Sequence, residues 1–126
     1  MSDSIVRCPS CGTRNRIPPD KGRLKAKCGR CGSSLGTGEV MELDDHTFDR
    51  IIQGASLPVL VDFFSPSCGP CRMLAPIIQS LAGDYAGQLM VAKLDTSRHR
   101  MTAAKFQIRG VPTLLFRIIS VASYPL

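Results

Sequence analysis

The sequence predicts an α/β protein in which a sheet is flanked by helices on both faces and preceded by a small metal-binding module. After residue 38, short apolar runs typical of buried strands alternate with stretches of helical periodicity. Two Cys-x-x-Cys pairs precede that point. Residues 32–38, GSSLGTG, have no periodicity and indicate a linker. We therefore expect the metal-binding module in residues 1–36 and the α/β domain in residues 37–126.

The first two cysteine pairs have the spacing of a structural metal site. Sixteen residues separate the two Cys-x-x-Cys pairs, which is typical of zinc sites. Each pair forms a tight turn, so its two thiolates reach one ion at about 2.3 Å, and four thiolates leave no position for substrate. We predict one structural Zn²⁺ per chain; two redox disulfides or an iron centre are the alternatives. The predicted ligands are Cys8, Cys11, Cys28 and Cys31.

The formal net charge of +6 belongs to the first module. Residues 1–38 hold eight basic and two acidic side chains, whereas residues 39–126 hold eight of each. A basic module can dock onto nucleic acid or another partner, so a binding module with weak or vestigial redox activity is the alternative to an enzyme. We favour a solvated surface and no nucleic-acid partner, because no aromatic side chain is available there for base stacking.

The α/β domain is predicted to begin with a helix and a buried strand. Asp44 or Asp45 can cap a helix that runs to about Gln53, because apolar residues recur at helical spacing after them. Residues 54–58 interrupt this pattern. The run Val59–Phe64 is short and mostly apolar, which is typical of a buried strand.

The next helix is expected to begin at Cys68 or Gly69 and to run to about Tyr85, with a kink at Pro76. The same alternation continues toward the end of the chain. The remaining expected elements are a parallel-type strand at 89–94, a short helix at 98–106 and a strand from 113 to about 121.

The third cysteine pair, Cys68 and Cys71, indicates redox chemistry. It follows an apolar strand and opens a helix, where free N–H groups and the helix dipole stabilise a thiolate at Cys68. Cys71, one turn further on, would be less exposed and could attack a mixed disulfide as the resolving thiol. Gly69 allows a partner chain to approach, and Pro70 suits the first helical turn.

Asp62 is an acid inside the apolar strand that precedes the cysteine pair. A buried carboxylate without a partner is costly, so it is usually neutral, hydrogen-bonded or functional. An acid with a raised pKa could take the proton from Cys71 and return it later. The alternative is an aspartate at the strand end that reaches solvent.

Three blocks, VDFFSPSCGPCRMLAP, VAKLDTS and RGVPTLLF, closely resemble the active-site blocks of thioredoxins, in order and at the family's spacing. The CPSC…CGRC module resembles the zinc ribbon of the bacterial thioredoxin 2 type. The resemblance covers nearly the whole chain except about the last ten residues. It implies a thioredoxin-like sheet, and a thiol-disulfide oxidoreductase that reduces protein disulfides and receives electrons from an NADPH-dependent flavoprotein, thioredoxin reductase.

The resemblance also implies roles for individual residues. Cys68 matches the attacking cysteine, Cys71 the resolving cysteine and Asp62 the buried acid. Lys93 matches the lysine that pairs with this acid. The segment Gly110–Val111–Pro112, with a cis-proline, would present the backbone edge on which substrate chains dock.

The chain departs from the thioredoxin pattern at two places around the active-site block and at its C-terminus. Ser67 and Phe64 stand where the family normally has Trp. After Pro112 the chain continues only as TLLFRIISVASYPL, without the family's last strand and helix, which suggests a shifted reading frame or a truncated copy. We expect a redox domain that is either marginally stable or rescued by self-association through the exposed edge strand 113–119, and a ribbon that folds independently.

The N-terminal residues MSDSIVRCPSCGTRNR have no apolar core like that of a signal peptide. No apolar run approaches the ~18–20 residues of a membrane helix. We therefore expect a cytoplasmic protein without a membrane partner.

Overall fold

The computed structural model describes residues 4–8, 10–18, 26–35, 38–55, 57–86 and 88–117. These residues form two sheets, an antiparallel hairpin of β1 and β2 and a four-stranded sheet in the order β3-β5-β4-β6. The elements in chain order are β1 (Ser4–Arg7), β2 (Arg14–Ile17), β3 (Met41–Leu43), α1 (Phe48–Gly54), β4 (Val59–Phe64), α2 (Gly69–Asp84), β5 (Met90–Asp95), α3 (Arg100–Lys105) and β6 (Thr113–Arg117).

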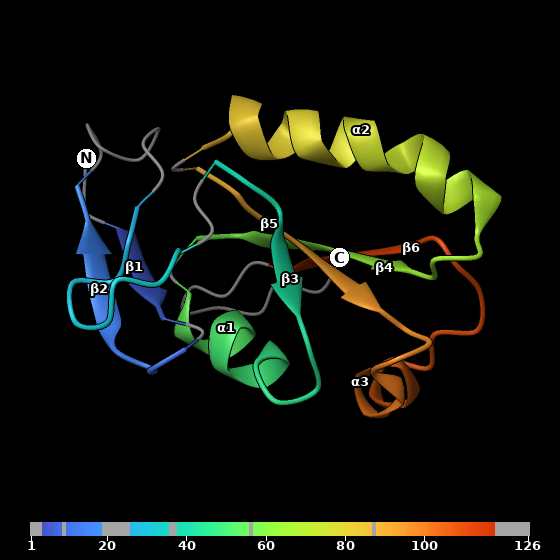
Figure 1. Cartoon of the computed structure of the whole chain (residues 1–126), viewed down its shortest axis with the longest axis horizontal. Helices are drawn as coiled ribbons and strands as arrows, with labels where there is room; N and C mark the ends of the chain where they lie inside the picture. Colours follow the sequence, from blue (N-terminus) through green and yellow to red (C-terminus); the bar gives the residue numbers. More distant parts are fainter. Residues whose placement is uncertain are drawn as a thin grey trace.

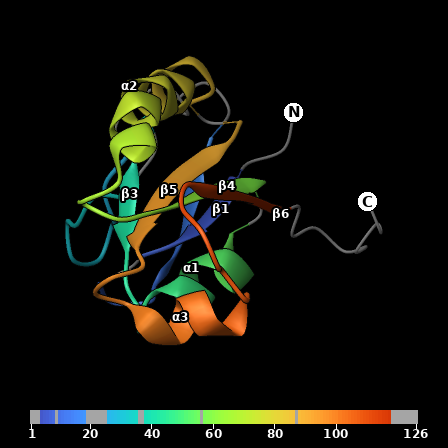
Figure 2. The same ribbon diagram turned by 90° about the vertical axis from the view of Figure 1, so that its right-hand side faces the viewer.

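The four-stranded sheet has helices on both faces, as the sequence predicts. α2 covers one face, and α1 and α3 lie on the other (Figures 1 and 2). Strands β3 and β4 are both parallel to β5, whereas β6 is antiparallel to β4 and lies at the edge. The carboxyl ends of β4 and β5 therefore meet at the same edge of the sheet, where the chain enters α2 and α3.

The long, strongly patterned elements agree with the prediction to within a few residues. β4 has the predicted bounds, and α2 begins at Gly69 with Cys68 as its N-cap. Pro76 lies inside α2. The three strands β1, β2 and β3 were not predicted, because each has only three or four residues and too few apolar positions to establish a period. The predicted extension of the last strand beyond residue 117 lies outside the described residues.

The start of α1 differs from the prediction. Thr47 occupies the N-cap position and its side chain makes no capping hydrogen bond. Asp44 instead organises the preceding turn, where its Oδ1 accepts the N–H groups of His46 and Thr47 at 2.8 and 2.7 Å. Asp45 accepts the N–H of Thr102 at 2.8 Å, which ties the turn to α3. Neither aspartate caps the helix directly.

One hydrophobic core spans both predicted modules. Val6, Ile17 and Leu35 of the first module are buried in the same cluster as Phe48 and Ile51 of α1. The hairpin therefore packs against α1 and shares its core. This shared core argues against a ribbon that folds independently of the rest of the chain.

The contact between β1 and α1 is close. A Cβ atom added at Gly54, the last residue of α1, would lie 2.7 Å from the Cβ of Arg7 and 3.0 Å from its Cδ. Two carbon atoms at this distance repel each other strongly, and a densely packed core leaves them no room to move apart. Glycine at this position is therefore what allows the hairpin and α1 to meet.

The opposite face of the sheet is less completely covered. Ile78 and Ala82 of α2 pack on Val91 of β5. On β6, Leu115 packs against the large core, so Leu114 and Phe116 point to the other face, where they are 48% and 46% exposed. Among the described residues, no helix has the length and apolar character needed to cross a bilayer.

Candidate redox and metal sites

Cys68 and Cys71 form a disulfide at the start of α2, with their Cα atoms 5.3 Å apart. Cys68 is the N-cap residue, and its Sγ accepts the N–H of Cys71 at 3.1 Å. Cys68 is partly exposed, whereas Cys71 is only 4% exposed. A target disulfide can therefore reach Cys68 much more easily than Cys71. The disulfide shows that the two sulfur atoms can bond while both cysteines keep their places at the start of α2.

The structure brings the segment 110–112 beside the disulfide. The carbonyl oxygen of Val111 lies 3.6 Å from the Sγ of Cys68, and the Val111–Pro112 peptide bond is cis. The hydroxyl of Thr113 donates to the carbonyl of Gly110 at 2.5 Å, which closes this turn. An added Cβ at Gly69 or Gly110 would meet no atom of the described residues within 4 Å, so this part of the chain leaves both glycines uncovered.

Asp62 is buried inside the sheet rather than exposed at a strand end. It is 4% exposed, and its Oδ1 has no hydrogen-bond partner among the residues that the structure describes. In the parallel register of β4 and β5 it lies opposite Lys93. Burial raises the pKa of the Asp62 carboxyl group above its ordinary value, although the charge of Lys93 acts in the opposite direction. A buried carboxyl group of this kind can hold a proton near neutral pH.

Asp62 and Cys71 line the same pocket, which has a volume of about 160 Å³. The ammonium group of Lys93 lies 5.6 Å from the centre of the Phe64 ring, within reach of a cation–π contact. The lining residues are Asp62, Phe64, Ser65, Pro66, Cys71, Arg72, Ala75 and Lys93.

The residue before the first active-site cysteine is small and polar. Ser67 is exposed, and its hydroxyl lies 3.1 Å from that of Ser65. Arg72, which follows Cys71, donates from Nη2 to the carbonyl of Pro66 at 2.9 Å and holds the same loop. The surface around the disulfide therefore has hydroxyl and guanidinium groups next to the sulfur atoms and no large apolar side chain at position 67.

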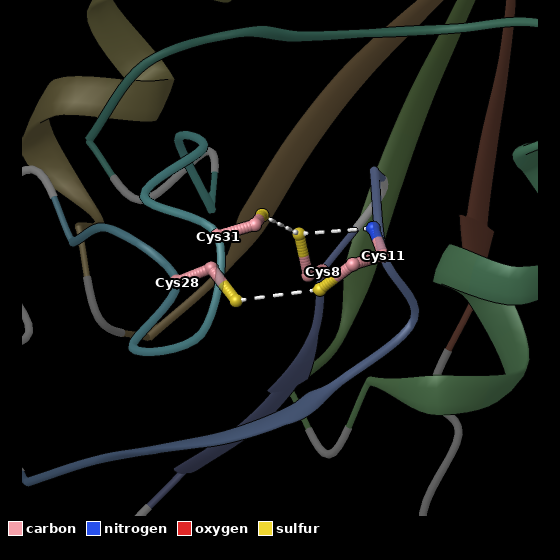
Figure 3. A group of neighbouring side chains, drawn as sticks. All are labelled: Cys8, Cys11, Cys28 and Cys31. Carbon is pink, nitrogen blue, oxygen red and sulfur yellow. Dashed lines mark hydrogen bonds between the residues drawn. The ribbon is translucent and has the colours of Figure 1, made fainter.

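The four other cysteines converge as the spacing predicts (Figure 3). Their Sγ atoms all lie within 4.8 Å of one another. We call each Cys-x-x-Cys turn a knuckle. Contacts between Sγ atoms link the two knuckles, from Cys8 to Cys31 at 3.5 Å and from Cys11 to Cys28 at 3.6 Å. A tetrahedral ion bound to four thiolates requires one compact group of sulfur atoms, and this arrangement fits that requirement.

The two knuckles have the same backbone structure. Gly12 donates to the carbonyl of Cys8, and Gly32 donates to the carbonyl of Cys28, each at 2.9 Å. Both glycines have positive φ angles, 78° and 80°, which other residues adopt only with strain. Asn15 was not singled out from the sequence, but it accepts the N–H of Gly29 at 2.9 Å and so ties the second knuckle to β2.

The thiols of Cys8 and Cys28 differ in pKa. Burial raises the pKa of Cys8 to about 11. The backbone N–H of Cys31 lowers the pKa of Cys28 to about 6, against the effect of burial. Binding of a cation to all four sulfurs would therefore release at least the proton of Cys8 at neutral pH.

Comparison with known proteins agrees with this geometry. The family profile described as Thioredoxin matches residues 39–120, and the profile described as Thioredoxin 2, N-terminal, matches residues 7–33. The chain is 37% identical to "Thioredoxin C-3" of Corynebacterium nephridii over 111 residues, which is 88% of this chain and 76% of that protein. It is 38% identical to "Thioredoxin" of Haemophilus influenzae over 77 residues, 61% of this chain and 72% of that one.

Plant proteins are similar over a shorter share of their length. The chain is 50% identical to "Thioredoxin M-type, chloroplastic" of Pisum sativum over 78 residues, 62% of this chain and 45% of the pea protein. Among solved structures, thioredoxin f from spinach chloroplast superposes with a TM-score of 0.63 at 32% identity, covering 68% of this chain and 71% of that one. The chain therefore belongs to the thioredoxin family, as a thiol-disulfide oxidoreductase of protein disulfides with an N-terminal ribbon of the thioredoxin 2 type.

Proposed function

We propose that Cys68 attacks target disulfides and that Cys71 resolves the mixed disulfide. In the reduced protein the thiolate of Cys68 displaces one sulfur of the target, which leaves as a thiolate and takes a proton. The thiolate of Cys71 then attacks the Sγ of Cys68, so that the intramolecular disulfide forms and the second target thiol is released. The dithiol loses two electrons and the target disulfide gains them. The difference in exposure between the two cysteines supports this assignment.

Asp62 is proposed to accept the proton of Cys71, and Lys93 to adjust the pKa of Asp62. Asp62 takes this proton, through water in the shared pocket, as Cys71 becomes a nucleophile. Lys93, opposite Asp62, limits how far burial raises the pKa of the acid and so keeps it able to exchange protons near neutral pH. The common pocket carries this proposal, because it contains the resolving cysteine and both charged groups.

The segment 110–112 is proposed to bind the target backbone. The carbonyl of Val111 beside Cys68 and the open space at Gly110 and Gly69 leave room for an extended chain across the disulfide. Pro70 and Pro112 border the same space by their positions next to Gly69 and Val111. Main-chain contacts of this kind bind without demanding one sequence, as a general disulfide reductase requires.

For the ribbon, we propose one structural Zn²⁺ held by the four converging thiolates, with residues 1–36 as its module and residues 37–126 as the redox domain. The ion would stabilise the fold without taking part in exchange, because four protein ligands complete its coordination. Such thiolates persist in a reducing compartment, so we place the protein in the cytoplasm. Its partners would be disulfide-containing proteins and, as electron donor, an NADPH-dependent thioredoxin reductase.

One assay tests the redox assignment. The full chain is incubated with insulin, NADPH and thioredoxin reductase, and both NADPH consumption and insulin reduction are followed, with dithiothreitol as an alternative donor. We expect catalytic reduction with either donor. Activity with dithiothreitol alone would contradict the reductase as partner, and no activity with either would contradict the proposed reaction. Zinc content measured on the same sample tests the metal independently.

A further inference from the structure

The two segments that contain the disulfide and the cis-proline turn have basic side chains but no acidic ones. Residues 63–83 and 96–117 contain no aspartate or glutamate. Of their basic side chains, Lys105 is paired with Asp49 at 2.9 Å. The basic residues of the two segments are Arg72, Arg98, Arg100, Lys105, Arg109 and Arg117. Six of the eight basic side chains of residues 37–126 therefore lie in the two segments that contain the disulfide and the cis-proline turn.

Two of these arginines come from the two segments that meet at the disulfide. Arg72 is exposed, follows Cys71 directly and is held over the loop before Cys68 by its bond to Pro66. Arg109 is exposed and precedes the turn whose Val111 carbonyl lies 3.6 Å from the Sγ of Cys68. The start of α2 and the turn before β6 lie at the same end of the molecule (Figure 1). We call Arg72 and Arg109 the basic rim.

Nearby carboxylates do not neutralise this rim. Asp62 and Asp95, which border the two segments, are only 4% and 6% exposed. Asp95 accepts the hydroxyl of Ser97 at 2.6 Å. Asp44 and Asp45 follow β3, which is separated from β4 by β5, and they accept hydrogen bonds from Thr47 and Thr102. Among the described residues, neither arginine of the rim has a carboxylate partner.

We propose that the basic rim selects target disulfides that are flanked by acidic residues. This inference rests on the proposed role of Cys68, because it concerns which disulfides reach that thiol. An acidic flank would be attracted during encounter and held while Cys68 attacks, and such attraction raises association rates most at low salt. Ser67 next to Cys68 offers no large apolar anchor, so charge has a larger share in target choice.

The test uses three synthetic peptides that share one intramolecular disulfide and differ in two flanking residues, Glu, Gln or Lys. The second-order rate constant for reduction by the fully reduced chain is measured for each, in stopped-flow experiments at several NaCl concentrations. At low ionic strength we expect the Glu peptide to react about tenfold faster than the Lys peptide, with the Gln peptide between them. At about 0.5 M NaCl the difference should largely disappear.

Charge-reversal variants locate the effect. Arg109→Glu, alone and with Arg72→Glu, should reverse the preference between the Glu and Lys peptides while the Gln peptide still reacts. Arg117→Glu makes the same change of charge at the opposite end of β4, next to Val59, and should keep the preference. Equal rates for all three peptides, or equal effects of Arg117→Glu and Arg109→Glu, would overturn the proposal. Failure of the unmodified chain to reduce even the Gln peptide would overturn the proposed function itself.

Discussion

Asp62 on β4 lies directly opposite Lys93 on β5, and both side chains line the pocket that contains Cys71. The acid is buried, and within the described part of the chain its Oδ1 has no hydrogen-bond partner. Such a group costs stability whenever it is ionised, so its presence in the middle of a strand is best explained by its place next to the resolving cysteine. Because burial raises the pKa of Asp62, this group makes the protein less stable as pH rises.

Asp62→Asn is expected to raise the free energy of unfolding at pH 8 by about 1–3 kcal/mol. The pKa of Asp62 is raised by burial, so its favourable contribution is present below the pKa of the unfolded chain and is lost as pH rises through the folded value. The gain should therefore largely disappear near pH 4, where the carboxyl group is about half protonated in the unfolded chain and more fully protonated in the folded protein. Urea unfolding at the two pH values measures it.

Asp95→Asn is the matched control for this prediction, because Asp95 is equally buried but accepts hydrogen bonds from Ser97. It should give no gain at pH 8. A stabilisation by Asp62→Asn that was the same at pH 4 and pH 8 would show that charge is not its cause.

Cys68→Ser is expected to lower the rate of insulin reduction by at least about a thousandfold, because no other thiol in the redox site is accessible. Cys71→Ser should instead accumulate a covalent complex with targets, since the mixed disulfide can no longer be resolved. Mass spectrometry of complexes trapped from a cell extract identifies the cysteine that carries the partner. A partner found on Cys71 in the Cys68→Ser variant would reverse the two roles.

Removal of zinc is expected to destabilise the redox domain as well as the ribbon. Cys8 and Cys28 are buried in the same core as Phe48 of α1, so loss of the ion would loosen packing on both sides of the linker. Calorimetry should show one cooperative transition that moves down by more than about 10 °C with a strong chelator. The variant with both Cys68→Ser and Cys71→Ser should retain one zinc per chain, and two separate transitions would argue for independent modules.

Gly54→Ala is expected to lower the free energy of unfolding by about 1–3 kcal/mol, because the new methyl group would collide with Arg7 of β1. Gly83→Ala provides the control: it is also a helical glycine, but an added Cβ there meets nothing within 4 Å. That change should stabilise the protein by about 0.5–1 kcal/mol through helix propensity. Thermal unfolding measures the stability of both variants. Equal changes in stability would mean that the hairpin does not pack closely against α1.

Self-association through β6 is expected at micromolar concentrations. β6 lies at the edge of the sheet, and its Leu114 and Phe116 are about half exposed. Leu114→Lys with Phe116→Lys should shift the protein toward monomer in analytical ultracentrifugation. Met101→Lys changes an equally apolar residue, 76% exposed on α3, and should leave association unchanged. Monomeric protein at all concentrations would contradict this prediction.

The sequence by itself was sufficient for features that depend on residues close together in the chain. Cys-x-x-Cys spacing brings two thiolates to one ion within a single turn, and the paired knuckles follow from it. Cys68 and Cys71 bond across one turn of helix for the same reason. β4 and α2 were predicted nearly to the residue, since each is long enough for its period to be seen.

Propensity and spacing do not say which distant residues meet. The resemblance to thioredoxins implied that Lys93 pairs with Asp62, and the tertiary structure places the two opposite each other through the parallel register of β4 and β5, where one residue of slip would put the lysine on the other face. The contact of Arg7 with Gly54 comes from packing of a hairpin whose strands are too short to be predicted. Local spacing determines geometry within a turn. Burial, which sets the direction of the pKa shift of Asp62 and joins the two modules in a shared core, is a property of surfaces that the folded chain brings together.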